Sequence, residues 1–252
     1  MRANLNATDS KSVHPRKQDA RCAVPPQFPS GGDVSLSTRC EAACSLIGVA
    51  QRSGSRDNGS VFRLLRPSED EKLRLLSTAR ETPVSSPHLL TLADGALGTP
   101  PKGFVHDLSR TEIGRGLLAF ETARDAFRRW QQFDLGWVQV LNPSAEIAPE
   151  QLVGVEVHTV CLWSISLNRV VETVDTPSRF GFMYATTALH VEQGQERFLI
   201  EFDPSTDAVS YLIEAVSRPR HSLARLAYPF SRAMQRRFAR DSHARLKRSV
   251  LG

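Results

Sequence analysis

Apolar and polar residues alternate along three runs in the last third of the chain, with the period of two that half-buried strands show. The runs cover residues 179–187, 196–202 and 208–217. Short turn-like segments separate them, so neighbouring runs are expected to pair as antiparallel hairpins. Apolar residues at helical spacing then extend from about 221 to 249. This order predicts an antiparallel sheet followed by one long amphipathic helix.

Earlier parts of the chain add weaker strands and two helices. Strands are expected at 104–112, 137–141, 153–163 and 169–174, with a short one at 89–92. Ser68 and Glu71 have the spacing of a capping box, which predicts a helix that ends before Pro83. A second helix is expected over 117–132. Its apolar positions share one face and predict a buried core made of Phe120, Ala123, Phe127 and Trp130.

The closing helix has one apolar face and several basic ones. Pro229 lies eight residues into the pattern and predicts a kink, or a loop before a straight second half. The apolar face is expected to point toward the sheet through Phe230, Met234 and Phe238. The arginines are then expected to face solvent, especially Arg236, Arg237 and Arg240.

The first part of the chain has no such pattern. Residues 1–58 are rich in Ser, Arg, Asn, Gly and Pro, and their apolar residues do not repeat for long, except for a weak helical pattern from Arg39 to Gln51. We expect residues 1–58 to be a disordered tail, which a start codon placed too far upstream would also produce. Residues 59–252 are expected to form a single globular domain.

The net charge of +5 hides an asymmetry. Residues 218–252 contain ten Lys and Arg residues and one Asp, so the other 217 residues sum to −4. The basic helix supports three interpretations: an ordinary solvated face, a weak contact with an anionic lipid surface, and nonspecific contact with nucleic-acid phosphates. No helix-turn-helix, zinc-finger or RNP pattern accompanies the charge, so no specific nucleic-acid partner is expected.

The cysteines and the N-terminal sequence indicate the cellular compartment in which the protein is expected. Cys22, Cys40 and Cys44 lie in the expected tail, and their spacing with His14 fits no standard zinc pattern. They are interpreted as reduced thiols, and neither a metal nor a cofactor is expected. No run approaches the ~20 apolar residues of a membrane span, and the chain start lacks the apolar region of a signal peptide. We therefore expect a cytoplasmic protein.

A set of spaced residues resembles a known family. Arg179, an aromatic strand ending in Tyr184, His190, Gly194 and Glu196 resemble the pattern of the domain of unknown function 1990 (DUF1990) family. A second match is the run Ile113-Gly-Arg-Gly-Leu-Leu-Ala-Phe, with Trp130 downstream. The chain departs from the family where the pattern has Tyr-Gly-Thr and Pro-Gly-His, because it has Tyr-Ala-Thr and Ala-Leu-His there. The resemblance implies a fold and no biochemical role.

The order of elements also resembles the helix-grip fold of START and birch-pollen-allergen proteins. In that fold a strongly curved sheet wraps the last helix and leaves a cavity between them. The fold class expected here is therefore α+β, with six to seven antiparallel strands curved around a long C-terminal helix. The alternative is an ordinary α+β sandwich in which side chains fill the same space. A helix grip predicts a cavity of at least ~300 Å³ under the helix, the lower end for small-molecule sites.

Candidate chemistry is sparse, because no catalytic motif such as GxSxG or HExxH is present. Arg179, Glu196 and Arg218 each lie near the start or end of a strand, and could form either a charge cluster at a pocket mouth or a structural ion-pair network. His190 lies near Glu192 and Glu196 and is a candidate general base, or a residue of a solvated turn. The candidate ligand-binding residues are Arg179, Phe182, Tyr184, His190, Glu196, Tyr211 and Arg218.

Three functions remain open. The preferred hypothesis is a noncatalytic domain that binds a small apolar or amphipathic ligand. The first alternative is a cyclase- or hydrolase-like enzyme that uses His190 with Glu196 or Arg218. The second alternative is an interaction protein that acts through the basic helix. The glycines of Gly114-Arg-Gly116 fall short of a phosphate-binding fingerprint and are interpreted as a strand-to-helix turn.

Overall fold

The computed structural model describes residues 62–93, 99–159, 162–190, 192–219 and 228–252, without the side chains of 62 and 228–230. The expectations for residues 1–58, including the helix at Arg39–Gln51 and the cysteines there, lie outside these described residues. So do Cys161, the first part of the closing helix pattern, and the side chain of Phe230.

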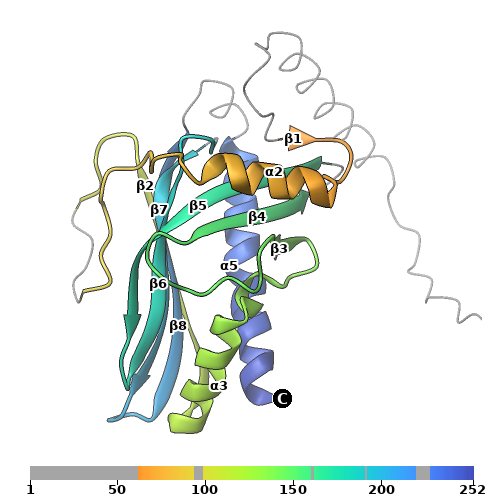
Figure 1. The fold of residues 1–252 in the computed structure, drawn as a ribbon. Helices are drawn as coiled ribbons and strands as arrows, with labels where there is room; N and C mark the ends of the chain where they lie inside the picture. Colours follow the sequence, from red (N-terminus) through yellow and green to blue (C-terminus); the bar gives the residue numbers. More distant parts are fainter. Residues whose placement is uncertain (1–61, 94–98, 160–161, 191, 220–227) are drawn as a thin grey trace, which may run out of the picture. The chain divides into compact units, whose positions relative to one another are not determined.

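Most of the described chain belongs to one antiparallel sheet and its helices (Figure 1). The strands are β1 (Phe62–Arg63), β2 (Val105–Arg115), β3 (Val138–Val140), β4 (Leu152–Thr159), β5 (Leu162–Asp175), β6 (Arg179–Thr186), β7 (Glu192–Asp203) and β8 (Ala208–Pro219). The helices are α2 (Glu69–Ala79), α3 (Gly116–Arg128), the short 3-10 helix η1 (Gln131–Phe133) and α5 (Tyr228–Leu251).

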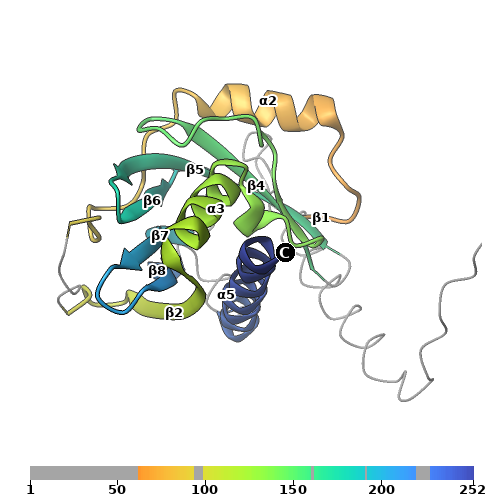
Figure 2. The same ribbon diagram turned by 90° about the horizontal axis from the view of Figure 1, so that it is seen from below.

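The strand order is β2-β8-β7-β6-β5-β4-β3, and β1 pairs with β5. Every paired strand runs antiparallel to its neighbour. The sheet curves around α3 and α5, whereas α2 lies against its opposite face (Figure 2). We call the face toward α3 and α5 the inner face and the other the outer face. The helix-grip class predicted from the sequence is confirmed.

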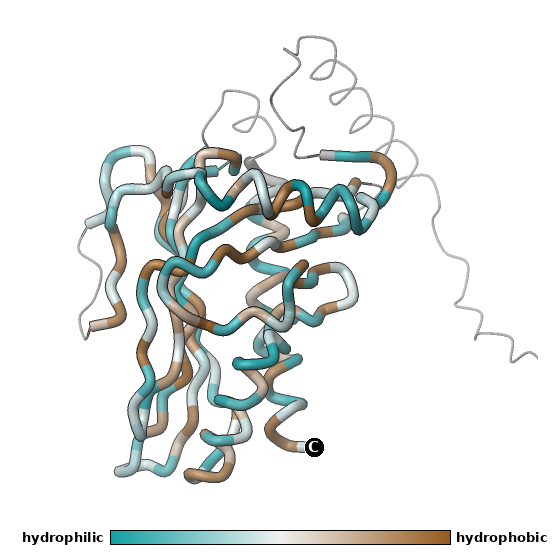
Figure 3. Tube along the Cα trace, viewed as in Figure 1, coloured by the Kyte–Doolittle hydropathy of each residue, from teal (hydrophilic) through white to brown (hydrophobic). Residues whose placement is uncertain are grey.

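Hydrophobic and hydrophilic residues alternate along the strands (Figure 3). This alternation assigns their side chains to the two faces of the sheet. Inner-face residues of β6 to β8 form the main core with α3, η1 and α5, through Phe180, Phe182, Phe198, Ile200, Val209 and Tyr211. Two smaller clusters lie on the outer face. One contains Leu90, Leu92 and Met183, and the other places Ala79 of α2 against Ile165 and Leu167.

The start of α2 and the end of α3 each have an identifiable cause. The Ser68 hydroxyl accepts the Glu71 amide at 3.3 Å, as the capping box predicts, but the Glu71 carboxylate pairs with Arg63 instead of reaching back. Helix α3 ends at Arg128, earlier than the expected residue 132. Trp130 follows with a left-handed φ of 56° and starts η1, so a backbone reversal ends the predicted helix.

Trp130 is buried as predicted, at 2% exposure. Its ring packs on Phe182 with centroids 5.1 Å apart, and its indole Nε1 donates to the Ala145 carbonyl at 2.8 Å. Burial of a large aromatic with its polar atom paired stabilises this junction of helix and sheet.

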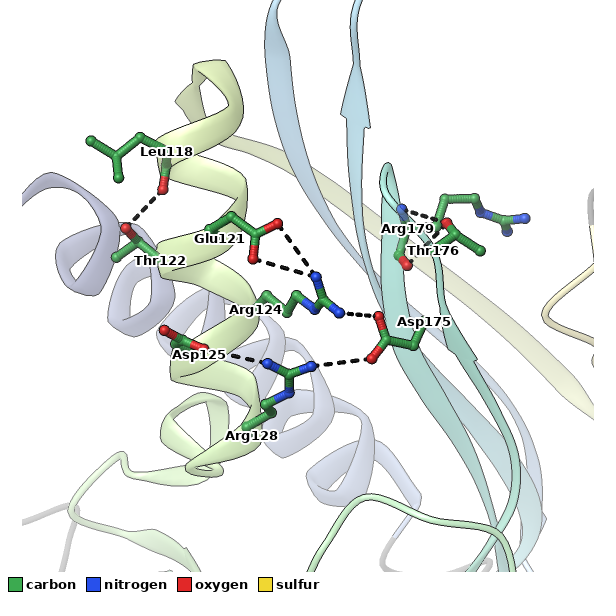
Figure 4. Close-up of polar contacts among 9 residues, drawn as sticks. All are labelled: Leu118, Glu121, Thr122, Arg124, Asp125, Arg128, Asp175, Thr176 and Arg179. Carbon is green, nitrogen blue, oxygen red and sulfur yellow. Dashed lines mark hydrogen bonds and ion pairs between the residues drawn. The ribbon is translucent and has the colours of Figure 1, made fainter.

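Helix α3 is tied to the β5–β6 turn by charge. Arg124 and Arg128 both reach the carboxylate of Asp175, and the Arg128 Nη2 distance is 3.1 Å (Figure 4). Both guanidinium groups also lie over the ring of Phe180, at 5.6 and 5.1 Å from its centroid. These contacts hold α3 on the lower inner face of the sheet.

Two strand predictions were wrong in detail. The run 153–163 was expected to be one strand, but β4 ends at Thr159 and β5 begins at Leu162. Its period of two continues across the break without a Gly, Pro or Asn that would mark a turn. The expected strand 89–92 pairs with none of the strands in the described part of the chain. Side chains of the outer face hold it, because Gln195 Oε1 accepts from the amides of Leu89 and Leu90 at 2.6 and 2.9 Å.

The described part of α5 starts at Tyr228, directly before Pro229. The predicted kink or entry loop at Pro229 therefore lies at the boundary of the described residues. Met234 and Phe238 face the sheet as expected. The Phe238 ring lies 5.4 Å from that of Phe133.

Candidate functional site

A cavity of about 820 Å³ lies between α5 and the inner face of the sheet. It exceeds the ~300 Å³ expected from the helix-grip interpretation. Inner-face residues of β2, β4, β5, β6, β7 and β8 contribute to its wall, together with η1, Trp137 before β3, and α5. The apolar part of the wall is made of Phe133, Trp137, Val138, Val155, Val157, Ile213, Met234 and Phe238.

The central polar pair of the cavity is Glu196 on β7 and Tyr184 on β6. The two residues are direct cross-strand partners, so both side chains point from the inner face. The Tyr184 hydroxyl donates to Glu196 Oε2 at 2.7 Å. Burial raises the pKa of the Glu196 carboxyl to about 7, an effect that the Tyr184 hydrogen bond opposes and the nearby Glu192 and Asp107 reinforce. Burial likewise raises the pKa of Tyr184 well above its ordinary value.

Two further acids of the cavity wall connect the sheet to the beginning of α5. Asp107 on β2 forms an ion pair with Arg232. Glu192 on β7 accepts hydrogen bonds from Ser231 Oγ at 2.6 Å and from Gln235 Nε2 at 3.2 Å. The first described turns of α5 are therefore anchored to both β2 and β7, and they cover the cavity.

Asn168 on β5 adds a polar group with an unmet requirement. It lines the cavity and is 2% exposed, and its Oδ1 has no hydrogen-bond partner within the described residues. Buried acceptors without partners are uncommon because each has lost its bonds to water. The Oδ1 atom is itself buried, so it is not presented to the open space of the cavity.

His243 of α5 also borders the cavity. Its Nε2 lies 3.0 Å from Ser109 Oγ on β2, and its ring lies 4.7 Å from that of Tyr211. Burial lowers the pKa of His243 to about 4, so this side chain is neutral near pH 7. It contributes no positive charge to the cavity under those conditions.

The arginines of α5 fall into two groups. Arg236 and Arg240 border the cavity from the exposed side of the helix, as the sequence predicted. Arg237 lies with its guanidinium carbon 4.2 Å from the Trp137 ring centroid and is only partly exposed, so the expectation of a solvent-facing Arg237 holds in part. Arg245 pairs with Asp134 at 3.0 Å. Much of the basic charge of the helix therefore makes contacts within the protein.

The structure brings together three of the seven predicted site residues. Tyr184, His190 and Glu196 line the cavity. His190 Nδ1 accepts the Glu192 amide at 2.9 Å, which fixes the ring at the end of the β6–β7 connection. Phe182 and Tyr211 lie on the inner face as well, but in the packed core next to α3, where Phe127 touches both rings.

Arg179 and Arg218 lie on the outer face, so the suggested cluster of Arg179, Glu196 and Arg218 does not form. Arg179 pairs with Glu201 at 3.3 Å and donates to the Leu92 carbonyl at 2.8 Å. Its guanidinium points away from α3 (Figure 4). Arg218 donates to Gln193 at 2.9 Å and covers the Phe104 ring.

The alternation in the sequence already contained this separation. Phe180, Phe182 and Tyr184 are alternate residues of β6 and share one face, whereas Arg179 belongs to the other set of alternate residues. The same parity rule puts Glu196 with Phe198, but it separates Arg218 from Tyr211. The cavity residues that were missed, such as Asp107, Asn168, Phe133 and Trp137, come from elements far apart in the sequence, and parity alone does not show that they meet.

The Gly114-Arg-Gly116 turn has a packing role. A Cβ on Gly114 would lie 2.7 Å from a methyl group of Val250 and 2.9 Å from Ala119, so α5 and α3 approach too closely for a larger residue. Gly116 has a φ of 84° and donates its amide to the Asp207 carbonyl at 2.8 Å. The Asp207 carboxylate beside it disfavours an anion. These contacts support the strand-to-helix turn interpretation.

Neither a metal cluster nor a membrane-spanning helix occurs among the described residues. They contain no group of three or more His, Cys, Asp or Glu side chains arranged to hold a metal ion. Among the helices of the described ranges, none has the length and apolar character needed to cross a bilayer.

Comparison with known proteins places the chain among sequences of one family. A family model described as domain of unknown function DUF1990 matches residues 90–245. A UPF0548 protein of Dictyostelium discoideum is 30% identical over 207 residues, which cover 75% of this chain and 96% of that protein.

Comparison with solved structures finds matches of low sequence identity and low TM-score. The crystal structure of Ara h 8.0201 is 7% identical with a TM-score of 0.39, over 57% of this chain and 98% of that chain. The di-domain ARO/CYC BexL, from the BE-7585A biosynthetic pathway, is 13% identical with a TM-score of 0.42, over 60% of this chain and 52% of that chain.

Proposed function

The chain belongs to the DUF1990 family, and we propose that it is a noncatalytic binding protein that holds a small apolar or amphipathic molecule between α5 and the sheet. The observation that carries this proposal is the cavity of about 820 Å³ at the place where a compact domain would have its core. Protein interiors are normally packed as densely as organic crystals. A hollow of this size with a largely apolar wall is therefore best explained by a ligand that fills it.

The wall has the chemistry of a site for an amphipathic ligand. Aromatic and aliphatic side chains from η1, β3, β4 and α5 would contact an apolar body. The Tyr184–Glu196 pair offers a few oriented polar atoms on the sheet side, which is the usual composition of small-molecule sites. Under this proposal the polar end of the ligand lies against the sheet.

Native mass spectrometry of the purified full chain tests the proposal first. We expect a bound species that adds a discrete mass under gentle conditions and leaves on activation. A neutral fluorescent probe, N-phenyl-1-naphthylamine, gives an independent titration: its emission should rise on binding and saturate at one site. Absence of both a copurified mass and saturable probe binding would contradict a ligand-binding cavity.

A filling variant localises the binding. Ala215 of β8 lies on the cavity wall between its cross-strand partners Asp107 and Glu196, so Ala215→Phe should occupy the space and weaken probe binding about tenfold or more. Ala208→Phe is the matched control, because Ala208 is on the same strand and is not part of the cavity wall. Equal loss of binding in both variants would place the probe elsewhere.

One observation favours a second candidate, a cyclase- or hydrolase-like enzyme that uses the same cavity. The Glu196 carboxyl has a pKa of about 7, which suits a general acid or base near neutral pH, and His190 borders the same space. To separate the two, the copurified molecule is extracted, returned to the protein and weighed again after incubation. An unchanged mass supports binding, and a changed mass that requires Glu196 supports the enzyme.

A further inference from the structure

We infer that the ligand of this cavity carries a cationic amine, and that the carboxylate of Glu196 is its counter-ion. The inference rests on the proposed binding function and names the chemical class of the ligand: an aromatic or alkyl amine whose apolar body fills the cavity. Four features of the described residues lead to it: the missing ion pair of Glu196, the raised pKa of its carboxyl, the aromatic rings nearby, and the remaining polar groups of the wall.

Glu196 differs from the other glutamates inside this domain. Glu156 is 1% exposed and pairs with Lys72 and Arg66, each at 3.0 Å. Glu214 is 2% exposed and pairs with Arg197 and with His106. Within the described ranges, no Lys, Arg or His side chain forms an ion pair with Glu196, whose partner is the neutral hydroxyl of Tyr184. The two other acids have cations supplied by the chain, and a bound amine would supply the third.

The electrostatics around Glu196 agree with this missing cation. Burial raises the pKa of Glu196 to about 7 because a charged carboxylate is poorly solvated in the cavity. The Tyr184 hydrogen bond stabilises the charged form but does not compensate for the burial. A protonated amine next to the carboxylate would favour the ionised form, as an opposite charge at ion-pair distance does.

The aromatic wall suits a cation as well. Phe133, Trp137, Tyr184 and Phe238 all line the cavity. The ring centroid of Phe133 lies 6.5 Å from that of Tyr184 and 5.4 Å from that of Phe238, so aromatic rings are grouped next to the Tyr184–Glu196 pair. A cation over such rings gains from their negative faces, and the gain is larger in a site shielded from water.

The remaining polar groups disfavour an anion. Glu192 is held by the neutral donors Ser231 and Gln235, so its negative charge is not cancelled by an ion pair with a described residue. Arg236 and Arg240 border the cavity from exposed positions, where solvent screens their charge.

The charged and titratable groups of the elements around Glu196 are Tyr184 of β6, Tyr211 of β8, Glu192 of β7, Asp107 of β2, His190 before β7, and Arg232, Arg236, Arg240, His243 and Lys247 of α5. Of the two histidines in this set, His243 is neutral near pH 7 because burial lowers its pKa to about 4, so His190 is the one that the experiment has to control for. Protonation of His190 would also repel an amine, so the experiment has to separate the two.

Three probes that share one apolar body test the inference on the full chain. They are 2-(1-naphthyl)ethylamine, 2-(1-naphthyl)ethanol and 1-naphthylacetate, titrated by calorimetry at pH 8. We expect the amine to bind about tenfold or more tightly than the alcohol, and the carboxylate to bind weakest. Equal affinity for the amine and the alcohol, or a preference for the carboxylate, would overturn the inference while leaving the cavity a binding site. Failure of all three probes to bind overturns the inference, whereas the ligand-binding proposal is decided by the copurified mass and by N-phenyl-1-naphthylamine binding.

Glu196→Gln removes the charge and keeps an acceptor for Tyr184. It should abolish the preference for the amine and leave the alcohol affinity within about twofold. Glu201→Gln is the matched control, because Glu201 is on the same strand but on the outer face, where it pairs with Arg110 and Arg179. A Glu196→Gln protein that still prefers the amine refutes the assignment.

The pH dependence of amine binding, in the native protein and in Glu196→Gln, gives a second measurement. The amine stays protonated between pH 6 and pH 8, whereas Glu196 changes from mostly protonated to mostly ionised across a pKa of about 7. Amine affinity should therefore rise about tenfold over this range, and the alcohol affinity should stay flat. A flat amine profile contradicts the inference, and a rise that survives in Glu196→Gln assigns the effect to His190 and also contradicts it.

Discussion

The inner face of the sheet has a packed half and a hollow half, although the same strands form both. Along β7 the inner-face residues change from Phe202, Ile200 and Phe198 to Glu196 and Gly194. Along β8 they change from Val209, Tyr211 and Ile213 to Ala215 and Ser217. Aromatic residues meet α3 in the packed half, and small or polar residues face α5 across the hollow half.

The second layer explains this difference. Helix α3 brings Phe120 and Phe127 against the packed half, where Phe127 meets Tyr211 with ring centroids 5.2 Å apart. Over the hollow half, the described part of α5 contributes Met234 and Phe238, while ion pairs and hydrogen bonds hold its first turns to the strand edges. Anchoring at the rim keeps the helix in place without filling the space beneath it.

Truncation of core side chains should give the largest difference between the two halves in the free energy of unfolding. Trp130→Ala removes a 2% exposed ring from the packed half and should lower the free energy of unfolding by ~3–5 kcal/mol. Met234→Ala removes a side chain that already borders the cavity, so it should cost about 1 kcal/mol or less. Urea denaturation of both variants measures this. A cost below ~1 kcal/mol for Trp130→Ala, or equal costs, would contradict the division into halves.

The titration of Glu196 should make the hollow half less stable as the pH rises. Its pKa is raised from 4.5 to about 7 in the folded protein, so the folded state binds the proton more tightly than the unfolded state. The penalty is absent below pH 4.5 and complete above pH 7, and it should lower the free energy of unfolding by about 3 kcal/mol between pH 4.5 and pH 8. Glu196→Gln should lose this dependence, which denaturation at several pH values measures.

His243, which packs on Tyr211, provides the opposite slope as an internal comparison. Its pKa is lowered from 6.5 to about 4, so the folded state binds the proton less tightly than the unfolded state. Stability is complete above pH 6.5 and falls as the pH drops toward 4, by about 2 kcal/mol between pH 7 and pH 5. His243→Gln should flatten the acid side of the profile and leave the Glu196 side unchanged. Loss of both slopes in one variant would show that the groups are not independent.

The exposed side of α5 should give the smallest effect. Contact with anionic membranes is expected to be weak, because Arg232, Arg237 and Arg245 are already paired within the protein. Arg236→Ser combined with Arg240→Ser should weaken the free energy of binding to phosphatidylserine vesicles by at most about 2 kcal/mol, and only at low salt. Cosedimentation measures this binding. Phosphatidylcholine vesicles are the control. Tight, salt-resistant binding would show that the surface of α5 is more important than the cavity.

Local pattern predicted most of the fold because each signal depends on neighbouring residues. The strands β6, β7 and β8 and the C-terminal helix follow from their periods. The burial of Trp130 was predicted as well, but from a helical spacing that does not reach it, because α3 ends at Arg128. The break after Thr159 was missed, since the alternation runs through it without a turn residue. The backbone reversal at Trp130 was missed for a similar reason, because a left-handed φ at a Trp has no sequence signal.

The candidate site was predicted only in part. Tyr184, His190 and Glu196 line the cavity, whereas the parity of each strand is sufficient to separate Arg179 and Arg218 from the residues of the inner face. Parity gives the face of a residue, but not its position along the strand relative to the covering helices. Phe182 and Tyr211 have the correct face and lie in the packed half.

By itself, the sequence determined the order of the elements, the antiparallel hairpins, and which side chains share a face of each strand, because these depend on periods and on short connections. The tertiary structure decided where α3 ends on the sheet, how α5 is anchored at the rim, and therefore which inner-face residues meet a solid core and which meet a cavity. It also decided that the carboxylate of Glu196 has no cation beside it among the described residues, while Glu156 and Glu214 do. Charge compensation depends on contacts between distant segments, and no local pattern encodes it.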